Sequence, residues 1–375
     1  MRNLSHRRRV AGGNQKTNAN APTAQTCRTL YRNRHSAAVH QYSLAPRHTP
    51  LYCSAWGGTL FMIIYRELSS LEHDLNIPAK TLYAVSNRVT SHYRPVSVPK
   101  KDGTVRRLFV PDAILKQIQK RILEVLLLPM EISPYATAYR DGGSPRRNAL
   151  PHLAPPMLLK LDIHAFFDSI FYQQVKAAAF PSTIYAEPLR ILLTLLCYHK
   201  DALPQGAPTS PAISNLVMRD FDNQLGLWCH ACGIVYTRYC DDLTFSGSFD
   251  KDEVKTYVQG LLRQYGFFLN PKKTVFALPH NRQCVTGIVV NQKPQTPRDF
   301  RRALLQEVYY CKKYGIAEHC RRRGILTDEE THLRRLLGQV SYALSVRKDD
   351  KKMRAARSDL LAMLRTKKSR ILSPK

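Results

Sequence analysis

Two adjacent carboxylates, Asp241 and Asp242, lie between two short apolar segments, 233–237 and 243–246. Acidic residues are poor strand formers, and two like charges about 4 Å apart repel by roughly 1 to 4 kcal/mol. A hairpin turn would aim both side chains at one divalent cation, and Mg²⁺ is the oxygen-seeking ion of phosphoryl chemistry. An ordinary polar turn is the alternative, because an isolated pair of acids does not by itself distinguish a metal site from a turn.

A third carboxylate favours the metal interpretation. Asp162 interrupts an apolar strand pattern, 158–163, and precedes Asp241 by 79 residues. With Asp242 these residues could supply the three carboxylates of a site for two Mg²⁺ ions about 3.5 to 4 Å apart. Asp168 follows at the expected start of a helix, where an acid is favourable near the positive end of the dipole. We therefore do not count Asp168 as a metal ligand.

The segments around these acids resemble the motifs of reverse transcriptases, in the family's order. They read LDIHAFF at 161–167 for motif A, LPQGAPTSP at 203–211 for motif B and YCDD at 239–242 for motif C. Flanking matches are RRLFVP and LKQIQ within 106–119 for the fingers motif, and GFFLNPKKT at 266–274 for motif D. The resemblance implies an α+β right-hand polymerase, with fingers, a palm built on an antiparallel sheet backed by helices, and a helical thumb.

Two more segments are similar to the retron branch of this family. NALPH at 148–152 fits the branch's NAxxH pattern, and VTG at 285–287 fits its pattern after motif D. Cys240 departs from the Ala that many retron enzymes carry, but both residues are small, so we expect activity to survive. The resemblance implies an RNA-directed DNA polymerase that copies part of its cognate structured noncoding RNA into a small single-stranded DNA.

The retron resemblance also implies how synthesis is primed and which partners the enzyme binds. Priming from an RNA 2′-hydroxyl would give a branched RNA–DNA product. The partners would be the noncoding RNA template-primer, its product, deoxynucleoside triphosphates and a separately encoded effector of antiphage defence. An intron-type or diversity-generating reverse transcriptase is one alternative, and the NAxxH and VTG segments argue against it. A noncatalytic RNA-binding scaffold is another, and the three retained carboxylates argue against it.

The resemblance assigns several residues to the incoming nucleotide. Lys101, in an expected hairpin tip, and Arg107, on the following strand, would clamp its phosphates, although a solvated basic loop is the alternative. Phe167 occupies the steric-gate position five residues after Asp162, where a ring beneath the sugar would exclude a 2′-hydroxyl. A plain core aromatic is the alternative for Phe167.

Motifs B and D supply the remaining candidates near the chemistry. Gln205 is the expected polar contact, and Gly206 would let the main chain approach template and nucleotide closely. Lys273 is a candidate general acid for the pyrophosphate leaving group, or a charge neutraliser. Lys272 is adjacent, and sequence does not separate the two.

Contacts with RNA are expected at two places. Asn148 and His152 would help to handle the structured RNA, although a buried capping role for Asn148 is an alternative. The run Arg321, Arg322 and Arg323 would contact phosphates without reading bases. A solvated basic helix surface is the alternative for that run.

Composition agrees with a polyanion partner. The 375 residues contain 57 Lys and Arg against 28 Asp and Glu, which gives a formal net charge of +29, and 44% are hydrophobic. A chain of this size and composition buries a substantial core. Nucleic acid is favoured over a membrane surface, because no uninterrupted apolar stretch of about 18 residues occurs. The nine cysteines are odd in number and scattered, which favours a reducing cytoplasm, and the pair Cys229 and Cys232 has no second pair at zinc spacing.

Charge and periodicity divide the chain. Residues 1–60 contain nine Lys or Arg and no acid, and we expect a disordered basic extension. An RNA-binding tail, a transit-like segment and translation from a later start at Met62 are its three explanations. Residues 61–160 would form N-terminal helices and fingers, and 161–297 the palm with part of the fingers inserted. Residues 298–375, with 21 Lys or Arg against nine acids, would form a basic helical thumb.

Overall fold

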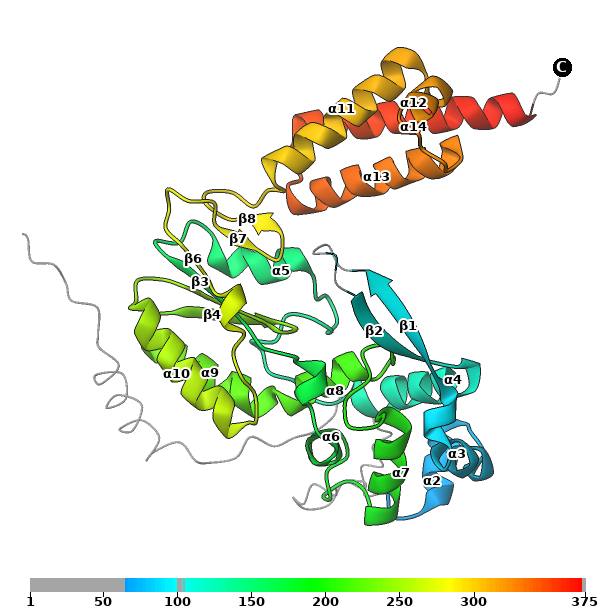
Figure 1. Ribbon diagram of the computed structural model, residues 1–375, viewed down its shortest axis with the longest axis vertical. Coiled ribbons are helices and arrows are strands. Elements are labelled where there is room, and N and C mark those ends of the chain that lie inside the picture. The colour runs from blue at the N-terminus through cyan, green and yellow to red at the C-terminus, as the bar shows by residue number, and fades with distance from the viewer. Residues whose placement is uncertain (1–64, 100–102, 104, 373–375) are drawn as a thin grey trace, which may run out of the picture.

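The computed structural model describes residues 65–99, 103 and 105–372. The expected extension 1–60 and Lys101 therefore lie outside the described residues. Along the chain, N-terminal helices and a long hairpin are followed by a sheet with helices on it and then by a bundle of helices (Figure 1). The expected α+β architecture is confirmed, and we use the names fingers, palm and thumb for these parts.

The fingers combine short helices with one two-stranded sheet. Asp112 begins the longest of these helices by accepting a hydrogen bond from the Leu115 N–H at 2.9 Å, a common N-cap contact. The helix then widens into one π turn, η2 (Leu123–Leu127). The other elements are α2 (Leu68–Leu75), α3 (Ala79–Ser86), η1 (Val89–His92), β1 (Tyr93–Pro99), β2 (Val105–Pro111) and α4 (Ala113–Ile122).

The palm is a four-stranded antiparallel sheet in the order β4-β5-β3-β6. Its strands are β3 (Leu158–Asp162), β4 (Val235–Tyr239), β5 (Asp242–Ser246) and β6 (Val275–Ala277). Side chains alternate between the two faces of each strand, so Leu159 and Leu161 share one face while Lys160 and Asp162 share the other. The leucine face belongs to the main hydrophobic core, and the face with Asp162 carries the polar residues.

Two long helices cover the leucine face of the palm sheet (Figure 1). They are α9 (Arg219–Ala231) and α10 (Lys251–Gln264), and they pack together through stacked Trp228 and Tyr257 rings 4.0 Å apart. The remaining elements of this part are η4 (Phe167–Ser169), α6 (Tyr172–Ala179), α7 (Glu187–Cys197), α8 (Ser210–Val217) and η5 (Pro271–Lys273).

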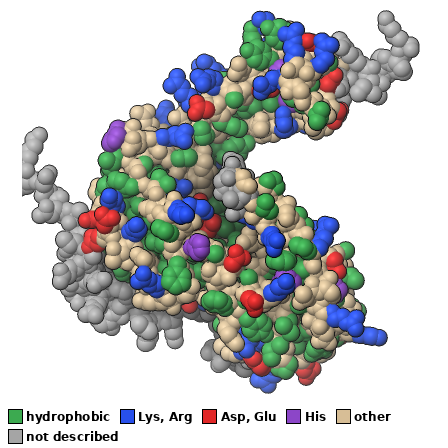
Figure 2. Space-filling model, viewed as in Figure 1, with side chains coloured by type: hydrophobic (Ala, Val, Ile, Leu, Met, Phe, Trp, Pro, Cys, Tyr) green, Lys and Arg blue, Asp and Glu red, His purple; other side chains and the backbone are tan. Residues whose placement is uncertain are grey.

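The thumb is a bundle with a hydrophobic core of its own. Its helices are α11 (Arg298–Tyr314), α12 (Ile316–Arg322), α13 (Glu329–Val346) and α14 (Lys351–Leu372). Apolar residues at helical spacing, such as Leu304 and Val308 or Leu333, Leu336 and Val340, build that core. Figure 2 shows an open cleft between the thumb and the rest of the chain.

The two segments that resemble the retron branch meet at the base of the thumb. The VTG segment is a hairpin tip between β7 (Cys284–Val285) and β8 (Ile288–Val289), and its central residues Thr286 and Gly287 have φ of 46° and 80°. Positive φ at both positions is what a type I′ turn requires, and glycine adopts it without strain. The Thr286 hydroxyl donates to the carbonyl of Pro145 at 2.9 Å, at the start of α5 (Pro145–Ala149). The NAxxH segment continues from α5 into η3 (Leu150–His152).

Candidate active site

The adjacent acids lie at a tight hairpin turn, as the sequence predicts. Tyr239 pairs with Asp242 across β4 and β5, which leaves Cys240 and Asp241 as the two turn residues. Cys240 has a φ of 61°, a left-handed conformation that costs a residue with a side chain about 1 to 2 kcal/mol. The Asp241 carbonyl accepts a hydrogen bond from the Ile163 N–H at 2.9 Å, so the end of β3 is tied to the turn.

The third acid lies directly opposite one of the pair. Asp162 and Asp242 are partners in the antiparallel pairing of β3 with β5, and directly opposed side chains on one face have Cβ atoms about 4.5 to 5.5 Å apart. Burial raises the pKa of Asp242, and the charges of Asp241 and Asp162 raise it further, while Lys160 and Lys273 oppose the shift. Like charges are therefore concentrated at this end of the sheet, where a bound cation would offset their repulsion.

Motif D supplies partners for Asp162. The Lys273 ammonium donates to Asp162 Oδ2 at 2.8 Å, and the Asn270 side-chain amide donates to Asp162 Oδ1 at 3.1 Å. The hydrogen bond to Asp162 raises the pKa of Lys273, whose side chain is 59% exposed. Lys272 is exposed, and its backbone N–H donates to the Asn270 side chain. Of the two lysines that sequence left unresolved, Lys273 is the one that reaches the acids, and Asn270 is a partner that sequence reasoning missed.

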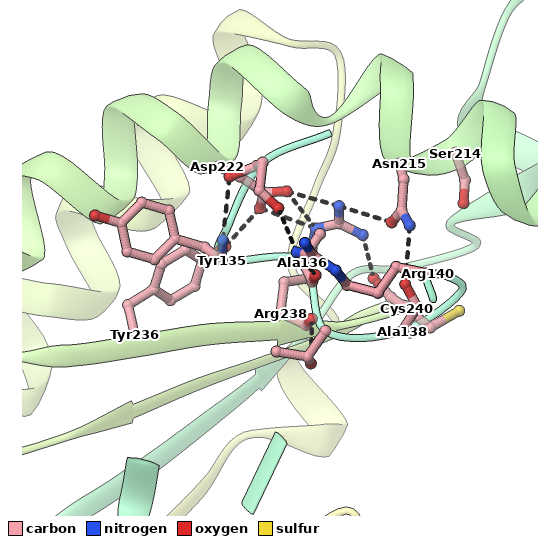
Figure 3. A network of polar contacts seen from close by, with 12 residues as sticks. Tyr135, Ala136, Ala138, Arg140, Ser214, Asn215, Asp222, Tyr236, Arg238 and Cys240 are labelled. Atoms are coloured by element: carbon pink, nitrogen blue, oxygen red, sulfur yellow. Dashed lines mark hydrogen bonds and ion pairs between the residues drawn. The ribbon is translucent and has the colours of Figure 1, made fainter. Parts of the chain in front are cut away.

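A buried arginine supports the turn from the helix side of the sheet (Figure 3). Arg238, on β4, is completely buried and faces Asp222 on α9. Its Nη2 and Nε donate to the Asp222 carboxylate at 2.6 and 2.9 Å, and Tyr236 donates its hydroxyl proton to the same carboxylate at 2.8 Å. Two parallel N–H contacts to one carboxylate fix the direction of the guanidinium as well as its position.

The remaining donors of Arg238 connect this pair to the turn at Cys240 and Asp241. Nη1 donates to the carbonyl of Cys240 at 3.0 Å, and Nη2 also contacts the Asn215 side-chain oxygen at 3.1 Å. The Asn215 amide in turn donates to the Ala138 carbonyl at 2.9 Å. A carbonyl of the YCDD turn is thus held by a fully desolvated cation that is itself fixed by helices α8 and α9.

Sequence reasoning did not single out Arg238 or Asp222. One signal was present, because Asp222 recurs with Met218 and Leu225 on the buried stripe of an amphipathic helix. A charged residue on such a stripe requires a partner, since an unpaired buried charge is costly. Arg238 in a strand pattern beside the turn is the matching signal on the other side.

Motif A and motif B touch through their main chains. The Leu203 N–H donates to the Phe167 carbonyl at 3.3 Å, and the Gln205 side-chain amide lies 3.5 Å from Asp168 Oδ1. Phe167 is half-buried, and its ring meets that of Phe166 edge-on with centroids 5.4 Å apart. Part of the Phe167 side chain is therefore exposed, and Asp168 is exposed within η4.

Gly206 is required by a close approach to the fingers. A Cβ at this position would lie 2.4 Å from the Phe109 carbonyl oxygen and 2.9 Å from its carbon, both in the main chain of β2. The sequence predicted a close approach to template and nucleotide, whereas the approach that the structure describes is to another strand. Arg107 lies two residues before Phe109 and is exposed, so motif B fixes the strand that carries this expected nucleotide contact.

The predicted RNA contacts of Asn148 and His152 do not fit the structure. Both side chains are completely buried. Asn148 accepts a hydrogen bond from Thr137 at 2.7 Å, and the His152 ring contacts Ser246 Oγ at 2.7 Å and Thr237 Oγ1 at 2.8 Å. Burial lowers the pKa of His152 to about 4, so the ring is neutral at pH 7. These residues fasten the NAxxH segment to the polar face of the palm sheet instead of touching RNA.

The arginine run lies on the thumb surface. The side chains of Arg321, Arg322 and Arg323 are 78%, 61% and 64% exposed. Glu318 pairs with the first two, and Glu307 pairs with Arg323 at 3.1 Å. Exposed pairs of this kind are weak and exchange readily for other anions. Within the described residues, no helix is both long and apolar enough to cross a membrane.

Comparisons with known proteins agree with this geometry. Residues 98–313 match the family model described as "Reverse transcriptase (RNA-dependent DNA polymerase)". The chain is 30% identical to the "Retron Ec86 reverse transcriptase" of Escherichia coli over 290 residues, which cover 74% of this chain and 89% of that protein. It is 33% identical to the "Retron Mx65 reverse transcriptase" of Myxococcus xanthus over 239 residues, which cover 58% and 56%.

A solved structure of apo telomerase from Candida tropicalis, truncated from its C-terminal domain, also aligns with this chain. The alignment has a TM-score of 0.38 and 15% identity, and it covers 56% of this chain and 55% of that one.

Proposed function

This chain belongs to the retron-type reverse transcriptases and is an RNA-directed DNA polymerase, and from that premise we propose the finer activity. It copies part of a cognate structured noncoding RNA into a small single-stranded DNA. Synthesis starts from a 2′-hydroxyl of that RNA, which gives a branched RNA–DNA product. The observation that carries the proposal is the placement of Asp162 opposite Asp242, next to Asp241, at one end of the palm sheet.

The three carboxylates fit a divalent metal. They offer hard oxygen donors, and burial raises the pKa of Asp242, to which the charges of Asp241 and Asp162 add. We propose that Asp162, Asp241 and Asp242 hold two Mg²⁺ ions. Bound there, the metal would activate the attacking hydroxyl and neutralise charge on the phosphates.

The residues around the carboxylates position the nucleotide and receive its leaving group. The Lys273 ammonium leaves its contact with Asp162 when the nucleotide binds, and it then donates a proton to the departing pyrophosphate oxygen. Arg107, on β2, and Lys101 bind the triphosphate, and Gln205 contacts the nucleotide from motif B. In each of these roles a charged or polar group would offset the phosphate charge of the bound nucleotide.

Phe167 selects deoxynucleotides by lying beneath the sugar. Replacing the ring in Phe167→Ala removes the surface that would collide with a 2′-hydroxyl, so incorporation of ribonucleotides should rise while that of deoxynucleotides changes less. Primer extension with matched deoxy and ribo substrates measures the ratio. Phe166→Leu is the matched control, because the Phe166 ring is buried in the core. Unchanged discrimination in Phe167→Ala would contradict the steric gate.

The RNA partner contacts the thumb. The exposed arginine run and the open cleft in Figure 2 support binding of the RNA and of its duplex with new DNA. We extend the proposal to antiphage defence with a separately encoded effector, and its support is membership of the retron-type family.

The test is expression of the chain with its upstream RNA region, followed by extraction of nucleic acid. Wild type is compared with Asp241→Ala/Asp242→Ala and with Asp252→Ala, which removes an exposed acid on α10. We expect a discrete small DNA in wild type and in the control only, with an RNA attachment that RNase and debranching treatment reveal. General primer extension without such a DNA would favour another reverse transcriptase class. Absence of all synthesis would favour a noncatalytic scaffold.

A further inference from the structure

A second group of metal-binding side chains lies in the thumb, away from the carboxylates. Cys311 on α11, His319 on α12 and His332 on α13 are all buried, and their ligand atoms all lie within 4.8 Å of one another. The three residues come from three different helices. The packing of these helices therefore brings together one sulfur and two ring nitrogens, the donor types that Zn²⁺ prefers.

A carboxylate completes the group. Glu307 lies one helical turn before Cys311 on α11. Its Oε2 is 2.8 Å from His319 Nε2 and 3.9 Å from His332 Nε2. Partial burial would raise the pKa of Glu307, but the contacts with His319, Arg323 and His332 lower it overall, so the carboxylate is ionised. Both histidine rings thus direct their Nε2 atoms toward one oxygen.

His332 has a buried polar atom that the protein leaves without a hydrogen bond. Its Nε2 has no such partner within the described part of the chain, and the residue is completely buried. An unsatisfied buried polar group is destabilising, and native structures contain few of them. Arg335 donates to the other ring nitrogen, Nδ1, at 3.0 Å, which leaves the proton of the neutral ring on Nε2. A metal on Nε2 would move that proton to Nδ1 and release the exposed Arg335.

We propose that the thumb holds a structural Zn²⁺ ion on four side chains from three helices: Glu307, Cys311, His319 and His332. Zinc–sulfur and zinc–nitrogen bonds of about 2.3 and 2.0 to 2.1 Å place tetrahedral donor atoms about 3.3 to 3.6 Å apart. The donor atoms of Cys311, His319 and His332 lie within 4.8 Å of one another, so they would draw closer by at most about 1.5 Å. Binding releases one proton, from the Cys311 thiol, because thiolate is the ligand form. Burial raises the pKa of that thiol to about 12 in the metal-free chain.

The location gives the ion a structural purpose. The thumb is a small bundle with a separate core, and small bundles gain most from a metal or another cross-link. α12 is only seven residues long and carries the arginine run at its C-terminal end. An ion on His319 would fasten α12 to α11 and α13, and it would fix where Arg321 and Arg322 meet the phosphates.

The proposed site escaped the sequence analysis because its spacing matches no compact zinc motif. Within the described residues, neither Cys229 nor Cys232 belongs to a group of three or more side chains that could hold a metal ion. In the thumb, by contrast, the ligands are spread over α11, α12 and α13 and meet only when the helices pack.

Metal content is the first test. The full chain, bound to its RNA and purified without a metal-affinity step, should contain about one zinc per chain. Cys311→Ser and His332→Gln should lose that zinc while the protein remains folded by circular dichroism. Cys320→Ala, a buried cysteine of α12 outside the proposed set, should keep it. Folded wild type with little zinc, or equal zinc in all variants, would leave only a hydrogen-bonded cluster and overturn the proposal.

Cobalt substitution and chelation supply a second measurement. Co²⁺ added to the zinc-depleted chain should give tetrahedral ligand-field bands and a thiolate charge-transfer band, and Cys311→Ser should lack the latter. A zinc-selective chelator in excess Mg²⁺ should lower the unfolding temperature of wild type but not of His332→Gln. The same zinc content is expected in Asp241→Ala/Asp242→Ala, so the outcome is independent of polymerase activity. Octahedral cobalt spectra, or chelation without effect on wild type, would contradict the site.

Discussion

The palm and the thumb hold their charged residues in opposite ways. In the palm, Arg238 is completely buried, and its three side-chain nitrogens donate to the Asp222 carboxylate and the Cys240 carbonyl. In the thumb, Arg321 and Arg322 are largely exposed and share a single carboxylate, Glu318. A buried charge fixes geometry because leaving it unpaired is costly, whereas an exposed pair contributes little and rearranges easily.

This difference suits what each region must do. Phosphoryl transfer depends on positioning, and a displacement of about 1 Å can cost roughly 100-fold in rate. The catalytic turn therefore benefits from a rigid buried support. On our proposal the thumb holds a moving duplex, and exposed arginines suit that role because phosphate contacts do not depend on the bases.

The largest effect should come from removing the buried palm arginine. Arg238→Met leaves the Asp222 carboxylate buried without a positive partner, with only the Tyr236 hydroxyl donating to it, and should destabilise the chain by about 3 to 5 kcal/mol. Arg238→Met/Asp222→Leu should recover most of that loss, because no uncompensated charge remains. Denaturant unfolding measures both, with Arg321→Met in the thumb as the control expected to change stability by less than about 1 kcal/mol. Equal losses of stability in Arg238→Met and Arg321→Met would contradict the difference between palm and thumb.

The next largest effect should be the change in stability when the buried His152, which contacts the palm sheet, is protonated. Burial lowers the pKa of His152 to about 4, against about 6.5 when unfolded. Between these values the unfolded chain binds a proton that the folded chain does not, so stability rises with pH across this range. The gain is about 3 kcal/mol.

Unfolding free energies of wild type and His152→Gln, taken at several pH values, isolate that contribution by difference. His230→Gln, which changes an exposed histidine, should keep the wild-type slope. Parallel curves for wild type and His152→Gln would show that the ring is not held neutral in the fold.

The two adjacent lysines of motif D provide a sharper test of the catalytic end. Lys273→Ala should slow single-turnover nucleotide addition about 100-fold, the lower end expected for a general acid. Lys272→Ala should remain near wild type, because Lys273 and not Lys272 contacts Asp162. Equal losses in both variants would assign the pair to phosphate binding instead of proton transfer.

Much of the palm was predictable because its signals are local. An acidic pair between two strand patterns predicted a hairpin, and Asp162 was expected near that pair; the structure has the hairpin and places Asp162 opposite Asp242. Alternating side chains then place the acids on one face. Partners that converge from distant segments were not predictable, because Arg238 and Asp222 meet only after α9 packs on the sheet.

The misassigned residues show the same limit. Asn148 and His152 were assigned to RNA by resemblance, yet the structure buries both of them against the sheet. Polar residue type alone does not separate a surface contact from a satisfied buried one. The reason for Gly206 likewise depended on Phe109, nearly a hundred residues earlier in the chain.

The smallest and most diagnostic effect concerns the salt dependence of RNA binding. If about eight phosphates are neutralised, log affinity falls with log salt at a slope of about −6 to −7. Arg321→Gln/Arg322→Gln/Arg323→Gln should reduce the magnitude of that slope by about 2 to 3 and weaken binding similarly for all sequences. Glu318→Gln should strengthen binding, because it releases two arginines from an internal pair.

Filter binding across a salt series measures these slopes. Arg263→Gln, on the palm helix α10 away from the cleft, is the matched control and should leave the slope unchanged. A wild-type slope near zero would contradict a thumb that holds RNA by charge. An unchanged slope in the triple variant would show that other basic residues contact the phosphates. The exposed arginine run would then differ from the buried palm arginine only in how rigidly it is held.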